Sequence, residues 1–205
     1  DVLEGVSVEV ERGKTVALVG ESGSGKSTLA RVITGLLPPT QGQVSYKGEI
    51  LSADLRNRGK EDLRRIQMIY QMPDVALNPR QRVRDVIGRP LEFYLSMRGK
   101  EKAARVAELL EQIELPVDFE ERYPAQLSGG EKQRVCIARA LAAEPDLIIC
   151  DEVTSALDQL VAEGILELLQ RLQNELGVSY LFITHDLATV KAIADDIVVM
   201  YQGKI

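Results

Sequence analysis

The sequence predicts an α/β fold with a mostly parallel sheet and an inserted helical segment. Towards both ends of the chain, short apolar runs rich in β-branched residues alternate with stretches of helical periodicity. Between residues 73 and 140 the strand-like runs disappear and helical spacing takes over. Strands that alternate with helices form parallel sheets with right-handed crossovers, and their ligand-binding loops lie at the carboxyl ends of the strands.

Each element follows from its local pattern. Apolar or alternating runs predict strands at residues 6–10, 15–19, 43–46, 66–70, 147–150, 179–183 and 196–200. Apolar side chains at helical spacing predict helices that end near Gly35 and Gly177, and a further helix over 187–194. We expect a single domain. Its α/β core consists of residues 1–72 and 141–205, and its helical subdomain consists of residues 73–140. The abrupt ends indicate a piece of a longer polypeptide.

Composition narrows the class of protein. With 205 residues, 45% of them hydrophobic and 27% charged, the chain is long enough to bury a core. A net charge of −6 argues against broad, non-specific binding of nucleic acid. Cys136 and Cys150 lack metal-ligand spacing, and we expect both to be buried and reduced. Because no apolar run approaches the ~18 residues of a membrane span, any role at a membrane is indirect.

The segment that organises the chain is Gly-Glu-Ser-Gly-Ser-Gly-Lys-Ser-Thr at residues 20–28. It fits the phosphate-loop pattern, and it lies between a predicted strand and a predicted helix, as that pattern requires. Its glycines let backbone N–H groups approach an anion beside the helix amino terminus. We expect a nucleotide to be held by Gly20, Glu21, Ser22, Gly23, Ser24, Gly25, Lys26, Ser27 and Thr28. The alternative is a Gly/Ser-rich turn before a helix, which leaves the Lys-Ser pair unexplained.

Within this loop, Lys26 is expected to reach the β- and γ-phosphates, and the Ser27 hydroxyl to ligate Mg²⁺. The acidic pair Asp151-Glu152 follows the strand predicted at 147–150. One carboxylate there can hold the same Mg²⁺, and the second can orient or deprotonate an attacking water. Taken alone, such a pair is as easily the N-cap of a helix. The phosphate loop favours the metal-binding interpretation.

A second glycine-containing segment, Leu-Ser-Gly-Gly-Glu-Lys-Gln-Arg at residues 127–134, opens a helix. Ser128 is a plausible N-cap, and Glu131 stands three residues later as its capping-box partner. A well-capped helix does not explain the adjacent Gly129 and Gly130, which cost helix stability. Two glycines do expose backbone N–H groups to an anion.

Together these motifs resemble the nucleotide-binding domain of an ABC ATPase. The order and spacing of that family's motifs are all present. Walker A matches residues 20–28, the Q-loop Gln71, the signature 127–134, Walker B 147–152, the D-loop 155–158 and the switch histidine His185. The match covers essentially the whole chain, and the signature is absent from monomeric P-loop kinases and GTPases. The resemblance implies a P-loop NTPase fold of the RecA-like kind, with an antiparallel β portion towards the N-terminus.

The resemblance also implies that ATP and Mg²⁺ are bound and that ATP is hydrolysed. Two such domains would meet head to tail and enclose two ATP molecules, each between the Walker A loop of one and the signature of the other. Ser128, Gly129 and Gly130 would then act across the interface on the γ-phosphate. Asp158 would lie at the seam of the dimer, although on local pattern it is an N-cap of the following helix.

Within one chain, the resemblance assigns the chemistry to four side chains. Glu152 would be the general base, and His185, the only histidine, would contact the γ-phosphate and position the water. Gln71 would touch both Mg²⁺ and the water, Lys26 would hold the phosphates, and the implied metal ligands are Ser27, Gln71 and Asp151. On local pattern alone, His185 could instead cap a helix, and Gln71 carries almost no information.

A narrower resemblance lies in residues 71–80, which are similar to the Gln-x-Pro-x-x-x-Leu-Asn-Pro-Arg segment of oligopeptide, dipeptide and nickel importer ATPases. Residues 122–126 fit the same group. It implies a motor at the cytoplasmic face of the cell membrane that drives transmembrane permease subunits and, indirectly, serves an extracellular or periplasmic solute-binding protein, with no nucleic acid partner. The basic run Arg80, Arg82, Arg84 and Arg89 either faces permease or lipid headgroups or is a solvated face.

Some features depart from the family pattern. Val153 stands where the family usually has proline, residues 158–163 are less typical of peptide importers, and no adenine-stacking aromatic precedes the phosphate loop. The main alternative is a non-transport ABC ATPase, of which the phosphonate-lyase type is the hardest to separate from an importer. Neither the transported solute, nor the make-up of the dimer, nor the direction of transport follows from the sequence.

Overall fold

A five-stranded parallel sheet lies at the centre of the computed structural model, which describes residues 2–205. Its strands run in the order β4-β5-β6-β1-β7, and every neighbouring pair is parallel. The strands are β1 (Thr15–Val19), β4 (Ile66–Ile69), β5 (Leu147–Asp151), β6 (Ser179–Thr184) and β7 (Asp196–Val199). The predicted α/β class with a mostly parallel sheet is therefore confirmed.

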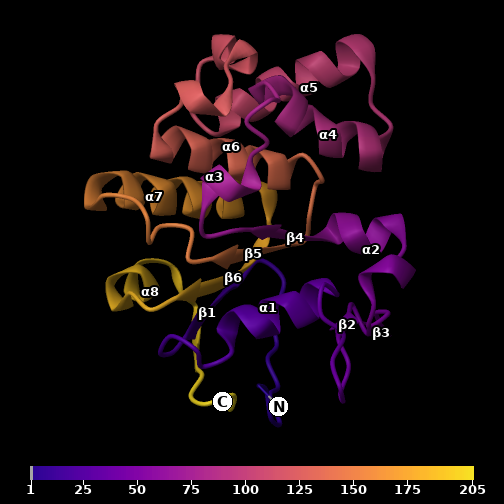
Figure 1. Ribbon diagram of the computed structural model, residues 1–205, viewed down its shortest axis with the longest axis vertical. Coiled ribbons are helices and arrows are strands. Elements are labelled where there is room, and N and C mark those ends of the chain that lie inside the picture. The colour runs from indigo at the N-terminus through magenta and orange to yellow at the C-terminus, as the bar shows by residue number, and fades with distance from the viewer. Residues whose placement is uncertain (1) are drawn as a thin grey trace.

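Helices cover both faces of this sheet (Figure 1). The core helices are α1 (Lys26–Thr34), α2 (Lys60–Arg65), α7 (Gln159–Leu176) and α8 (Leu187–Ile193). Between β4 and β5 the chain forms α3 (Pro73–Ala76), α4 (Val83–Leu95), α5 (Gly99–Gln112) and α6 (Gly129–Leu141). Short 3₁₀ turns lie at Leu55–Asn57, Val117–Glu121 and Pro124–Gln126. In Figure 1 the helices α3 to α6 gather on the side of the sheet away from α1.

The alternation of side chains along the buried strands explains this layering. Along β5, Ile148 and Cys150 pack on the side of α6 and α7, whereas Ile149 between them packs on the side of α1. In β6 the same alternation places Tyr180 and Phe182 on the first side. Strands buried on both faces carry near-continuous apolar runs, which is the pattern that made them visible in the sequence.

The first predicted strand, at residues 6–10, is wrong: the structure has no strand there. Val6, Val8 and Val10 do turn towards the core, while the residues between them are exposed. Alternate burial requires only an apolar surface on one side, whereas a strand also requires a neighbouring strand to pair with. The antiparallel β portion is instead a small hairpin of β2 (Ser45–Tyr46) and β3 (Glu49–Ile50).

Helix ends and cysteines agree with the sequence. Both α1 and α7 end at a glycine in the left-handed region, Gly35 at φ 78° and Gly177 at φ 68°, a conformation that glycine adopts without strain. Cys136 and Cys150 are both free and buried. Burial raises the pKa of Cys136 to about 11 and moves the pKa of Cys150 upwards as well, so both thiols stay protonated. Within residues 2–205, every helix is too short or too polar to cross a bilayer.

Candidate functional site

The loop from β1 to α1 has a backbone that only glycine can form at key positions. Gly25, the N-cap of α1, has φ 110°, and Gly23 has φ 81°. A Cβ atom on Gly20 would lie 2.1 Å from the carbonyl oxygen of Met200, at the end of β7. The loop is therefore packed closely against the residue that follows β7, just before helix α1. A glycine-rich loop that leads into a helix is the backbone arrangement that binds phosphate groups.

Lys26 is folded into this loop. Its ammonium donates to the carbonyl oxygens of Gly20 at 2.7 Å and Glu21 at 2.8 Å, and the residue is only 6% exposed. The positive charge is therefore held inside the loop and beside the amino terminus of α1, where the helix dipole adds to it. A loop with this charge and these N–H groups fits the phosphates of a nucleotide.

Ser27 and Asp151 come together although 124 positions separate them. The Ser27 hydroxyl donates to Asp151 Oδ1 over 3.2 Å, from the start of α1 to the end of β5. Burial raises the pKa of Asp151; the Ser27 bond opposes this shift, and the nearby charge of Glu152 adds to it. A hydroxyl and one carboxylate are the hard oxygen ligands that Mg²⁺ takes when phosphates and water complete its shell, so the pair fits this ion.

Glu152 is the centre of a second cluster. Its Oε2 accepts a hydrogen bond from the Gln71 amide at 2.9 Å, and its Oε1 lies 3.4 Å from His185 Nδ1. These three side chains follow the ends of β4, β5 and β6, which are neighbours in the sheet. Glu152 is also held in the left-handed region, at φ 50°, with its N–H donating to the Ile183 carbonyl at 2.9 Å. A positive φ is uncommon in a residue other than glycine, although Glu152 is not the only such residue in this chain.

Ser155 belongs to this cluster; it was predicted only as part of the D-loop match at 155–158 and was given no role of its own. Its hydroxyl accepts from the Gln71 amide at 3.2 Å and donates to the Glu152 carbonyl oxygen at 2.9 Å. A serine three residues after an acidic residue carries no distinctive local signal. Only the tertiary structure brings Gln71 to it.

The Ser128–Gly130 segment lies apart from these clusters, at the amino terminus of α6. Ser128 caps α6, and the predicted capping box with Glu131 is present. Gly130 packs against Val161 of α7, and Asp158 caps that helix by accepting from the Val161 N–H at 3.1 Å. Asp158 is therefore an N-cap, as its local pattern indicated, and its position at the seam of a dimer stays a prediction.

His185, in contrast, does not cap the helix that follows it. Asp186 does so, by accepting from the backbone N–H groups of Ala188 and Thr189. The histidine ring is left to face Glu152, which removes the local alternative for this residue. The acidic pair likewise does not serve as a helix cap, since Asp151 is bonded to Ser27 and Glu152 to Gln71.

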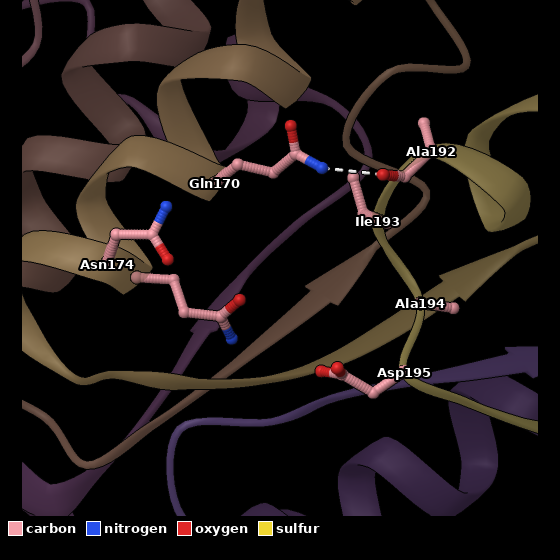
Figure 2. A pocket seen from close by; sticks show the side chains of 7 residues that line it. Gln170, Asn174, Ala192, Ile193, Ala194 and Asp195 are labelled. Carbon is pink, nitrogen blue, oxygen red and sulfur yellow. Dashed lines mark hydrogen bonds between the residues drawn. The ribbon is translucent and has the colours of Figure 1, made fainter.

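A cavity of about 420 Å³ lies at the other end of the sheet. Figure 2 shows the amide side chains of α7 facing the end of α8 and the connection to β7, with Gln170 donating to the Ala192 carbonyl. Asp195, at its edge, accepts from the N–H of Thr15, the first residue of β1. Because the phosphate loop follows the last residue of β1, this cavity is not part of the clusters described above.

The parallel sheet, the glycine loop at the end of β1 and the Ser27–Asp151 pair define the chain as a P-loop nucleotide-binding protein. Comparison with known proteins identifies the family within this class. The family described as ABC transporter matches residues 3–155, and the chain belongs to this family. The predicted resemblance to ABC ATPases is confirmed.

Several curated relatives are named as import or transport ATP-binding proteins. The dipeptide transport ATP-binding protein DppF of Haemophilus influenzae is 44% identical over 203 residues, which cover 98% of this chain and 62% of the relative. The nickel import ATP-binding protein NikE of Escherichia coli strain K12 is 45% identical over 204 residues, which cover 100% of this chain and 76% of the relative. The chain spans 54–62% of the length of four of the curated relatives that it matches.

Solved structures show the same fold. The structure of cbiO1 from Clostridium perfringens, part of the ABC transporter complex cbiONQ, is 29% identical with a TM-score of 0.88 over 99% of this chain and 79% of that one. A dimeric ATP-binding cassette in a post-hydrolysis state, bound to ADP and Pi, is 32% identical with a TM-score of 0.84. That match covers 100% of this chain and 88% of the cassette.

Proposed function

We propose that this chain is the ATP-hydrolysing motor of an ABC importer for peptides or a similar small solute. The observation that carries the proposal is the convergence of Gln71, Glu152 and His185 beside the phosphate loop and the Ser27–Asp151 pair. This set contains a phosphate cradle, a pair of metal ligands and a carboxylate held by both of its oxygens. ATP hydrolysis needs these three parts together.

Each residue of the site has a role that its position supports. The N–H groups of residues 20–28 and the Lys26 ammonium bind the phosphates, and Ser27 and Asp151 hold Mg²⁺, with Gln71 as a further ligand when nucleotide is present. When bound, Mg²⁺ neutralises phosphate charge and fixes the phosphate geometry. Glu152 accepts the proton of the attacking water, and His185 and Gln71 orient its carboxylate.

The second half of the site comes from a second copy or a related ATPase domain. Ser128, Gly129 and Gly130 present the amino terminus of α6 on a part of the surface that no hydrogen bond among residues 2–205 joins to the phosphate loop. In a head-to-tail dimer this helix end supplies N–H groups to the γ-phosphate of the partner. Asp158 lies at the start of the neighbouring helix α7, at the same edge.

The surface next to Gln71 supports a permease partner. Tyr70, Met72 and Val75 are exposed by 43%, 55% and 81%, and they flank or closely follow Gln71. Three exposed apolar side chains within six positions of the chain favour a binding surface here. The predicted basic run is not one uniform surface, because Arg82 and Arg84 both pair with Glu121. Arg89 instead lines a hollow of about 270 Å³ with Lys60 and Phe93, and is free to face a partner.

The hydrolytic role is tested with Glu152→Gln. We expect this variant to bind ATP and to dimerise, while its turnover falls at least about 100-fold, because a general base contributes at least that factor. The control is Lys26→Ala, which should lose nucleotide binding altogether. Normal turnover in Glu152→Gln would remove Glu152 from the role of base.

The transport role is tested by a pull-down of full-length Glu152→Gln with ATP from its native cells. We expect a multi-span permease to co-purify, and its companion binding protein to indicate the class of solute. Recovery of soluble enzymes, ribosomes or DNA without any membrane protein would contradict the importer role. That result would favour a non-transport ABC ATPase with the same chemistry.

A further inference from the structure

Arg171, on α7, reaches across to the end of α5. Its Nη2 donates to the carbonyl oxygen of Gln112, the last residue of α5, at 2.6 Å, and to Glu114 Oε1 at 3.3 Å. These contacts span 59 and 57 positions of the chain. The last carbonyl groups of a helix have no partner within it, and the helix dipole favours a cation beside them. Arg171 supplies both the donor and the positive charge.

Glu114 joins Arg171 to a second arginine, Arg134 of α6. Arg134 Nη1 donates to the Ile113 carbonyl oxygen and to Glu114 Oε2, both at 2.8 Å. The two oxygens of one carboxylate therefore bridge α6 and α7, while both arginines also hold carbonyl groups at the end of α5. Because Arg134 lies about one helical turn beyond Gly130, this junction is close to the start of α6.

The junction connects two parts of the chain. We call residues 73–140, between β4 and β5, the helical insert, and the other described residues the α/β core. In Figure 1 the insert forms one end of the molecule, and α7 of the core lies next to α6. Among the hydrogen bonds and ion pairs of residues 2–205, only those of Arg171 join insert and core, apart from backbone bonds where the chain enters and leaves the insert.

The other contacts between insert and core involve apolar groups. Cys136 of α6 and Ile165 of α7 belong to one cluster of buried residues, and the Lys60 ammonium lies 4.9 Å from the centroid of the Phe93 ring. Apolar attraction follows the buried area and has no preferred direction. A charge-assisted hydrogen bond does depend on direction, because the N–H has to point at its acceptor. Arg171 therefore restrains the orientation of the insert more sharply than the apolar contacts do.

This orientation matters because the two halves of the proposed site lie on different parts. The phosphate loop and the Ser27–Asp151 pair belong to the core, whereas the Ser128–Gly130 segment belongs to the insert. In the proposed dimer each nucleotide meets the core of one chain and the insert of the other. Both nucleotides are contacted at once only when the insert lies at a suitable angle to the core.

We propose that Arg171 is a positioning residue that fixes the helical insert on the α/β core, at the orientation in which Ser128–Gly130 meets the partner's nucleotide. Glu114 and Arg134 pass this restraint on to α6. Arg171 itself lies outside the motifs identified in the sequence, and it acts at the end of α7 that is far from Asp158. The inference rests on the proposed head-to-tail dimer, and it adds a residue that adjusts how the two halves of the site are presented.

The first test measures the orientation directly in the ligand-free full chain. Spin labels are attached at Lys100→Cys in α5 and Lys191→Cys in α8, two exposed positions, and double electron–electron resonance gives the distribution of distances between them. Cys136 and Cys150 are buried and protonated, so they stay unlabelled. We expect Arg171→Met, which keeps an unbranched side chain and loses the guanidinium, to broaden this distribution.

The matched control is Arg105→Met, which removes an ion pair with Glu108, 2.8 Å long, that stays within α5. Its distribution should equal that of the parent. Glu114→Gln weakens the contacts of both arginines and leaves the Gln112 carbonyl in place, so it should broaden the distribution less than Arg171→Met does. It also serves if Arg171→Met does not fold. If neither variant differs from Arg105→Met, the positioning role is overturned.

The second test is ATP-driven dimerisation in the Glu152→Gln background, measured by analytical ultracentrifugation. We expect Arg171→Met to weaken dimerisation about fivefold, since a partly exposed ion pair has a modest effect. Binding of ATP to the isolated chain should be unchanged, because the phosphate loop is untouched. If the parent itself fails to dimerise with ATP, the proposed function is wrong, and the distance distributions still decide whether Arg171 fixes the insert. If the parent dimerises and Arg171→Met does so as well as Arg105→Met or better, Arg171 does not position the Ser128–Gly130 segment.

Discussion

At the scale of single residues, the Asp151 carboxylate lies in an environment that disfavours its negative charge. It is half-buried at the end of β5, it has one hydrogen bond, from Ser27, and the charge of Glu152 follows it in the chain. Burial therefore raises its pKa in the folded state. A divalent cation bound beside it, as proposed above, would offset this cost.

We therefore expect Asp151→Asn to stabilise the ligand-free protein above the raised pKa, by less than about 1 kcal/mol, because water still screens a half-buried charge. A carboxyl group with a raised folded-state pKa contributes stability that is present below its unfolded pKa and lost as the pH rises through the folded pKa. The gain over wild type should thus grow as the pH rises through that value and then level off.

The measurement is urea unfolding at a series of pH values without nucleotide or Mg²⁺. Activity should move in the opposite direction, with Mg²⁺-dependent hydrolysis falling by a factor of about 100 or more. A variant less stable than wild type at pH 8 would mean that the Asp151 carboxylate is not a destabilising group in the fold.

The site residues that the sequence predicted are those that belong to a continuous motif or directly follow a recognisable strand. Lys26 and Ser27 belong to a continuous motif, and Glu152 follows a recognisable strand, so the sequence was enough to select them. Ser155 was named only as part of the D-loop match, because its place in the site depends on a contact with Gln71, 84 positions away. Which roles these residues play in hydrolysis remains a prediction for the variants above.

At the scale of elements, the start of α6 is fitted closely to the start of α7. A Cβ atom on Gly130 would lie 2.6 Å from Val161 Cγ1, a distance at which either the valine side chain or one of the helices must shift. On Gly129 it would lie 3.6 Å from Leu157 Cδ2, which is ordinary contact. Gly130 is thus required by packing within the chain, independently of any anion that its N–H binds.

Gly130→Ala should therefore lower the free energy of unfolding by about 1–3 kcal/mol, as overpacking does. The β-branched Val161 cannot easily turn away, because its χ1 rotamer is fixed in a helix. In a Val161→Ala background the clash disappears, and the same change should become neutral or stabilising by up to about 1 kcal/mol, since alanine favours helix.

Denaturant unfolding of the four proteins in this cycle measures the coupling between the two positions. Gly129→Ala is the matched control and should cost nothing, because its methyl group finds room. An equal cost of Gly130→Ala with and without Val161 would mean that the packing of α6 on α7 is not the reason for glycine at this position.

At the scale of the whole molecule, the sequence predicted the class of fold but not its arrangement. Apolar runs on both faces of β5 and β6 indicated a buried sheet, and the glycine loop indicated where a ligand binds. The strand order depends on which strands find each other in three dimensions, and no local pattern encodes it. At residues 6–10 a local pattern was present but led to a wrong prediction. The alternation of apolar and polar residues there reflects burial of one side of the segment and does not reflect pairing with another strand.

The bonds of Lys26 within its own loop have a consequence for the selection of ligands. Its ammonium already has two carbonyl acceptors, at 2.7 and 2.8 Å. A ligand gains from this lysine only if its own oxygens compete successfully with those carbonyls. Multiply charged phosphate oxygens do so, because their full negative charge attracts the ammonium more strongly than the partial charge of a carbonyl oxygen does. A nucleoside without phosphates carries no such charge, and it therefore gains no binding energy from Lys26.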